Sequence, residues 1–181
     1  MILKPNALVY VRRTDLFIGG KHMSAVKLKF SDELMKDMEL LNYEAFVNFC
    51  QEFFVAHDLK SKRVLVVLDQ GLVFNKVKAA SDNEASSMLR SYIEMMPFEP
   101  GQRACITRVK DDQIYLYATN ADIYKSIEDA LSQAGNRKIY AITPAAAYDI
   151  NYASRPGSVI EQFLEDKDSS KLFDFSTTSA V

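Results

Sequence analysis

The amino-acid sequence predicts an α+β protein with two lobes, in which a mixed sheet is flanked by helices. Between residues 63 and 142, strand-length apolar segments alternate with amphipathic helix patterns, and few residues are left between them. The run VLVVL at residues 64–68 is continuously apolar, which is typical of a central strand covered on both faces. The 181 residues are 48% hydrophobic and 25% charged, which is enough apolar material for one core.

Three strands are expected before the first helix. Residues 7–13 and 16–20 are separated by Thr14-Asp15, which predicts a tight hairpin. Residues 25–30 alternate apolar side chains with lysines, the period of a half-buried strand. The N-terminal residues therefore predict a small sheet to which the central strand at residues 64–68 can be added.

Helix signals divide the middle of the chain. Asn42 can cap a helix with an apolar stripe of Phe46, Phe49, Cys50, Phe53 and His57. Ser81 and Glu84 have the spacing of a capping box before a second helix, which Pro97 ends. Asn120 and Gly135 can begin and end a third helix.

The polar turn Lys110-Asp111-Asp112 predicts an antiparallel hairpin, and residues 138–144 predict the last strand. Beyond Tyr152, one helix pattern at residues 158–165 precedes a polar stretch of low periodicity. We expect the last dozen or so residues to be a disordered tail or linker, and residues after about Asp168 to be dispensable for the fold.

Composition limits the classes of function. The formal net charge of −2 provides no global attraction to nucleic acid. Cys50 and Cys105 each stand where a small buried hydrophobe fits, which favours free thiols in a reducing compartment. No window approaches the roughly 18 apolar residues that a membrane-spanning helix needs. We therefore expect a cytoplasmic protein without direct membrane insertion.

No catalytic, cofactor-binding or metal-binding residues are predicted. The segment FIGGKHMS at residues 17–24 lacks the P-loop spacing, so its two glycines predict a strand turn with positive φ angles. Neither His22 nor His57 has partners at the spacing of a metal set, and Asp111-Asp112 is typical of a turn. Arg12 and Arg13 fit either a small basic rim or a solvated sheet edge.

A tyrosine cluster is open to two interpretations, because tyrosine either fills a core or lines a binding surface. Its members are Tyr115, Tyr117, Tyr124, Tyr140, Tyr148 and Tyr152.

The order of segments in residues 43–150 resembles the first half of the actin-like pilus assembly protein PilM, a relative of the division protein FtsA and of the cytoplasmic domain of the secretion protein GspL. The similar segments are a helix leading into the strand VLVVLD, the helix end MLRSYIEMMPFEPGQ, and IYLYATNADIYKSIEDALSQAG followed by KIYAITPAAAY. Together they cover about 60% of the chain in consistent order.

The resemblance implies a domain organisation. Residues 1–152 would form half of an actin-like domain, with a strand-helix-strand-strand insertion lobe at about residues 73–141, and residues 153–181 a C-terminal helix with a flexible tail or linker. Members of this family that bind ATP have Asp, a small residue, Gly and Ser or Thr after their first strand. This chain has Arg12, Arg13 and Thr14 there and lacks the family's second half, so we expect no cofactor.

The function implied is that of a non-enzymatic scaffold in a type IV pilus or type II secretion-like machine of bacteria, recruited to the inner membrane by its partners. The partner expected is the cytoplasmic tail of an inner-membrane pilus or secretion protein, bound in a groove between the N-terminal sheet and the insertion lobe. The predicted partner-binding residues are Met95, Met96, Phe98, Tyr115 and Tyr117. The alternatives are a fragment or degenerate subunit of an actin-like ATPase and a small-ligand-binding regulatory domain.

Overall fold

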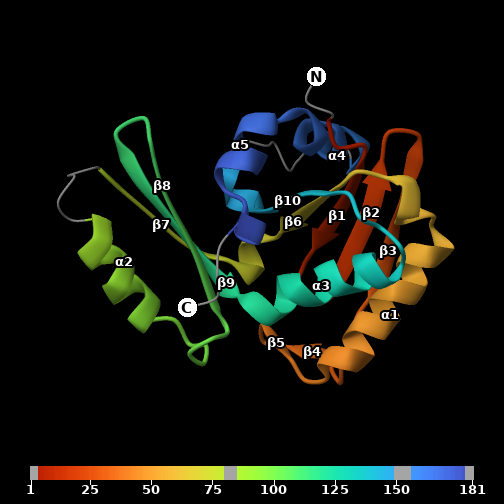
Figure 1. Cartoon of the computed structure of the whole chain (residues 1–181), viewed down its shortest axis with the longest axis horizontal. Helices are drawn as coiled ribbons and strands as arrows, with labels where there is room; N and C mark the ends of the chain where they lie inside the picture. The colour runs from red at the N-terminus through yellow and green to blue at the C-terminus, as the bar shows by residue number, and fades with distance from the viewer. Residues whose placement is uncertain (1–3, 80–84, 149–155, 178–181) are drawn as a thin grey trace.

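The computed structural model describes residues 4–79, 85–148 and 156–177. Its larger sheet has five strands in the order β10-β6-β1-β2-β3, with β6 parallel to both of its neighbours and the hairpin strands antiparallel (Figure 1). The strands are β1 (Ala7–Val11), β2 (Asp15–Gly20), β3 (Met23–Lys29), β6 (Val64–Leu68) and β10 (Ile139–Pro144). The mixed α+β fold class, the N-terminal hairpin and the central position of residues 64–68 are thus confirmed.

Helices cover both faces of this sheet. All five residues of β6 are buried, and their alternate side chains belong to two different apolar clusters. One face packs against α1 (Tyr43–Ala56) and α3 (Ala121–Gln133), and the other against α4 (Pro156–Glu165). The continuous apolar run in the sequence therefore has the cause that was predicted.

The predicted helix boundaries depend on short-range hydrogen bonds. The side chain of Asn42 accepts from the backbone N–H of Ala45, and that of Asn120 accepts from Asp122. Gly135 follows α3 with a φ of +82°, a left-handed conformation that glycine adopts without strain. The predicted capping box of Ser81 and Glu84 lies outside the described residues.

A second, three-stranded sheet has the order β7-β9-β8, and it is accompanied by α2 (Ala85–Glu94). Its strands are β7 (Phe74–Ala79), β8 (Arg103–Lys110) and β9 (Gln113–Asn120). The predicted hairpin is present, and its turn consists of Asp111 and Asp112, with positive φ angles of 51° and 57°, while Lys110 is the last residue of β8. The strand-helix-strand-strand order occupies residues 74–120, because α3 and β10 pack with the larger sheet.

The segment after α4 differs from its prediction. Residues 167–172 form α5 (Lys167–Leu172), and Phe173, Asp174 and Phe175 beyond it are buried. In Figure 1, α5 lies beside β10, and residues 175–177 after it contact β8. The expectation of a disordered tail after about Asp168 is wrong for residues 169–177, because the few apolar residues in this polar stretch are buried between the two sheets.

The two glycines of β2 also have a different role from the one predicted. Neither Gly19 nor Gly20 has a positive φ; the turn after them is made by Lys21 and His22, and His22 has a φ of 66°. A Cβ on Gly20 would lie 2.4 Å from the backbone oxygen of Asn6. The expected strand turn is present, but Gly20 is needed for close backbone approach and not for turn conformation.

Further observations concern the cysteines, the length of the helices and a short hairpin. Cys50 is buried and Cys105 partly buried, and both are free thiols, as expected. In the part of the chain that the structure describes, no helix is long and apolar enough to cross a membrane. A short hairpin of β4 (Met35–Lys36) and β5 (Glu39–Leu40), which the sequence did not indicate, precedes α1.

Candidate functional site

The carboxyl ends of the parallel strands β1 and β6 bring two polar turns together. The turn after β1 contains Arg12, Arg13 and Thr14, and the turn after β6 contains Asp69 and Gly71. The backbone N–H of Asp69 donates to the carbonyl of Val11 (2.9 Å), so the two turns are neighbours. Crevices at this edge of a parallel sheet are where ligands commonly bind in α/β proteins, which makes the chemistry of this edge informative.

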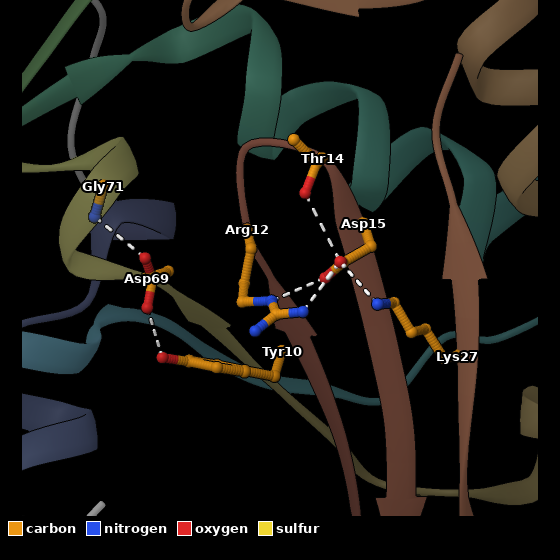
Figure 2. Close-up of polar contacts among 7 residues, drawn as sticks. All are labelled: Tyr10, Arg12, Thr14, Asp15, Lys27, Asp69 and Gly71. Atoms are coloured by element: carbon orange, nitrogen blue, oxygen red, sulfur yellow. Dashed lines mark hydrogen bonds and ion pairs between the residues drawn. The ribbon is translucent and has the colours of Figure 1, made fainter.

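Asp15 is the centre of one half of this polar network (Figure 2). Its carboxylate accepts from Arg12 Nε and Nη2 at 2.5 and 2.7 Å, and Lys27 Nζ lies 3.0 Å away. Burial alone would raise the pKa of Asp15, but the bonds from Arg12 and Lys27 outweigh burial and hold the pKa below its usual value. The Arg12 guanidinium also lies over the ring of Phe17.

Asp69 is the centre of the other half of the polar network. Its carboxylate accepts from the hydroxyl of Tyr10 and from the backbone N–H of Gly71 (2.9 Å), as Figure 2 shows. Arg13 reaches across and donates from Nε to the Gly71 carbonyl at 2.6 Å. The arginine pair does not lie on a sheet edge, because β1 is between β6 and β2, and both guanidinium groups bind groups of the protein itself.

The five predicted partner-binding residues do not share one surface. Phe98 packs edge to face on Phe74, and Phe74 is paired with Ala118 on β9. Successive side chains of a strand point to opposite faces, so Tyr117, next to Ala118, lies on the other face of the sheet. Tyr115 shares the face of Tyr117.

Burial divides the five residues further. Met96, Phe98 and Tyr117 are buried, Tyr115 is partly buried, and Met95 is 63% exposed. The structure therefore does not bring all five residues together in one groove. Tyr115 and Tyr117 line an opening in the surface.

That opening, called the inter-sheet pocket below, is a pocket of about 240 Å³ between the three-stranded sheet and the segment that follows β10. The three-stranded sheet contributes Tyr115, Tyr117 and the exposed Lys110, and the segment after β10 contributes Tyr148; the full lining is Lys110, Tyr115, Tyr117, Ala146, Ala147, Tyr148 and Phe173. The hydroxyl of Tyr117 donates to the backbone oxygen of Ala146 at 3.4 Å, across the junction. Of the predicted tyrosine cluster, Tyr117, Tyr124 and Tyr148 are buried in the core, and Tyr115, Tyr117 and Tyr148 line this pocket, so each interpretation describes part of the cluster. Tyr152 lies outside the described residues.

Tyr117 is buried. Burial, followed by the proximity of Tyr115, raises the pKa of Tyr117 to about 12, so its hydroxyl keeps its proton at neutral pH. The rings of Tyr115 and Tyr117 stack with centroids 6.4 Å apart and an interplanar angle of 19°. The pocket therefore presents flat aromatic surface with a cationic amine, that of Lys110, at its lining.

Sequence reasoning missed Phe173 as a residue of this site. Phe173 and Phe175 are two aromatic residues at strand-like spacing in a polar stretch, which was the available signal. Within the described residues, no group of three or more His, Cys, Asp or Glu side chains could hold a metal ion.

Comparisons with known proteins give matches in solved structures alone. No protein-family model matches this chain, and no curated protein matches it either. One similar structure is a PilM–PilN type IV pilus biogenesis complex, with 14% identity and a TM-score of 0.48 over 78% of this chain and 46% of that one. Another is the cytoplasmic domain of EpsL, an inner-membrane component of the type II secretion system of Vibrio cholerae, with 8% identity and a TM-score of 0.47 over 78% and 57%.

A third similar structure is a Bacteroides thetaiotaomicron protein with an actin-like ATPase fold and unknown function, with 7% identity and a TM-score of 0.44 over 71% of this chain and 49% of that one. The chain spans about half the length of these three structures. They belong to the classes that the sequence resembles, namely pilus and secretion assembly proteins and actin-like folds. At these identities and TM-scores, the likeness concerns the arrangement of the chain, and no argument on function rests on it.

Proposed function

We propose that this chain is a non-enzymatic scaffold of a type IV pilus or type II secretion-like machine, which acts in the cytoplasm by binding a peptide of a membrane-anchored partner. The observation that supports this proposal is the inter-sheet pocket lined by Tyr115, Tyr117 and Lys110. Tyrosine supplies rigid contact area at low entropic cost and is common at binding hot spots. The class of partner comes from the sequence resemblance.

The polar network at the carboxyl ends of β1 and β6 supports a non-catalytic role. A phosphate would need amide or cationic donors that point at a common place. Here the carboxylate of Asp15 engages Arg12 and Lys27, and Arg13 binds the Gly71 carbonyl. A nucleotide would have to compete with these internal partners for the same cations.

Calorimetry separates the scaffold from an actin-like ATPase subunit. The proposal predicts no binding heat when Mg-ATP is titrated into the full chain at about 100 μM. Micromolar affinity for Mg-ATP, or release of phosphate above the buffer rate, would contradict the non-enzymatic role. It would favour the ATPase alternative.

The peptide-binding role is tested with Tyr115→Ala. The probe is a fluorescein-labelled peptide with the cytoplasmic tail sequence of the PilN-type membrane protein from the source genome. Truncating a binding hot spot costs about 2 kcal/mol or more, so the dissociation constant should rise about 30-fold. Tyr115 is only partly buried, so the variant should stay folded. Val55→Ala, at a side chain 57% exposed on α1, is the control and should bind like the parent.

A further inference from the structure

We infer that residues 167–177 are an internal ligand of the groove between the two sheets, and that the partner's peptide carries a similar aromatic-aspartate-aromatic sequence and displaces them. This inference rests on the proposed function and deepens it, because it names the peptide that the groove recognises and the segment that competes with it.

Two aromatic rings of the segment sit in defined places. The ring of Phe173 meets Tyr115 and Tyr117 edge to face, with centroids 5.5 and 5.1 Å apart. The ring of Phe175 stacks on Tyr124 of α3 at 5.9 Å. The first ring thus touches the three-stranded sheet and the second touches a helix of the larger sheet. A peptide bound this way bridges both lobes.

Asp174 provides the polar anchor between the two rings. Its Oδ1 accepts from the backbone N–H of Ile142 (2.8 Å) and from the N–H and hydroxyl of Ser176 (3.1 and 2.8 Å). Ile142 belongs to β10, the edge strand of the larger sheet. Asp174 therefore accepts a hydrogen bond from a buried backbone N–H of the edge strand. Without Asp174, this N–H would be left without a partner.

Two further hydrogen bonds, each to a backbone carbonyl, hold the segment. Arg108 of β8 donates from Nε to the carbonyl of Leu172 at 3.0 Å. Lys171 donates to the carbonyl of Tyr140, and its ammonium lies 4.2 Å from the centre of the Tyr140 ring. Contacts to a carbonyl do not depend on the side chain of the bound residue, so Arg108 can hold another peptide in the same register.

The groups that bind the Asp174 carboxylate are neutral. Of the residues that the structure describes, Arg12 and Lys27 form ion pairs with Asp15, and no cation pairs with Asp174. Glu128 lies close enough that its pKa is raised, first by burial, then by Asp129 and then by Asp174. The docked state is thus held by the aromatic contacts and by the hydrogen bonds that Asp174 accepts from neutral groups.

The pocket beside Phe173 shows where displacement can begin. Phe173 forms part of its lining, next to Tyr115 and Tyr148, so the edge of the docked segment is reached from the surface. An aromatic residue of the partner can first occupy this space beside Tyr115. It then takes the place of Phe173 as the segment leaves.

The test uses the full chain and two labelled peptides. One peptide has the sequence of residues 171–177, and the other is the PilN-type tail used above. Phe175→Ala removes the ring that stacks on Tyr124, which weakens the docking of residues 167–177. The residues that contact Phe173, namely Tyr115 and Tyr117, are left unchanged. Both peptides should bind this variant at least tenfold more tightly than the parent, because less competition remains. Val55→Ala should bind like the parent.

The outcomes separate the inference from the proposed function. If the tail peptide binds the parent and Phe175→Ala equally well, the proposed function stands and the internal ligand is refuted. If the 171–177 peptide gains affinity while the tail peptide binds neither protein, the groove recognises the segment but the proposed partner is wrong.

A second variant guards against loss of the fold. Should Phe175→Ala unfold, Asp174→Ala replaces it, because this change removes the polar anchor but keeps both rings. If the folded Asp174→Ala variant shows no gain in affinity for either peptide, the inference is overturned.

Discussion

The docking of residues 167–177 makes a strong prediction for Phe175→Ala. The ring is fully buried and stacks on Tyr124 with an interplanar angle of 21°. Removing a buried phenylalanine costs about 3–5 kcal/mol, and the low end is expected here because undocking of the segment limits the loss. About 3 kcal/mol corresponds to a fall in Tm of roughly 6–12 °C for a chain of this size.

Differential scanning calorimetry at pH 7, with urea unfolding as a second measure, decides this prediction. Val55→Ala is again the control, because substitutions at exposed sites usually stay within about 0.5 kcal/mol. A Tm for Phe175→Ala within about 2 °C of the parent would refute the reasoning. It would mean that the segment adds little to the fold, as the sequence pattern alone indicated.

Two pH-dependent predictions follow from the carboxylates. Asp15 has a lowered folded pKa, so its contribution to stability is present above the unfolded pKa and is lost as the pH falls through the folded pKa. Asp15→Asn should therefore lower the Tm at pH 7, with a smaller difference from the parent below about pH 4; an equal loss at both pH values would contradict the ion pairs. Glu128 has a raised folded pKa, first through burial, so its stabilising contribution is present below the unfolded pKa and is lost as the pH rises through the folded pKa. Urea titrations should show Glu128→Gln more stable than the parent at pH 7 and similar to it near pH 4, whereas a variant less stable at pH 7 would show that the charge of Glu128 supports the fold.

Local signals explain the parts of the fold that the sequence predicted well. Asn42 and Asn120 cap helices through bonds to residues two or three positions away, and Asp111-Asp112 makes a turn within four residues. The strand at residues 64–68 has no polar residue to expose, so any sheet must cover both of its faces. Such features need no knowledge of distant contacts.

The candidate site depends on distant contacts, and prediction was weaker there. The spacing of Tyr115 and Tyr117 places them on one face of a strand, but the side of the sheet on which Phe98 lies depends on where the preceding helix packs. Likewise, Phe173 is buried by residues far from it in the sequence, such as Tyr115 and Tyr117 of β9. Composition does not indicate these long-range contacts.

Hydrogen–deuterium exchange of the full chain, with and without the PilN-type tail peptide, tests most directly whether the inter-sheet groove binds the partner. The account predicts slower exchange in the β8–β9 hairpin around Tyr115 and faster exchange in residues 167–177 when the peptide is bound. Protection confined to α2 and the residues around Met95, with no change at Tyr115 or in the 167–177 segment, would contradict it.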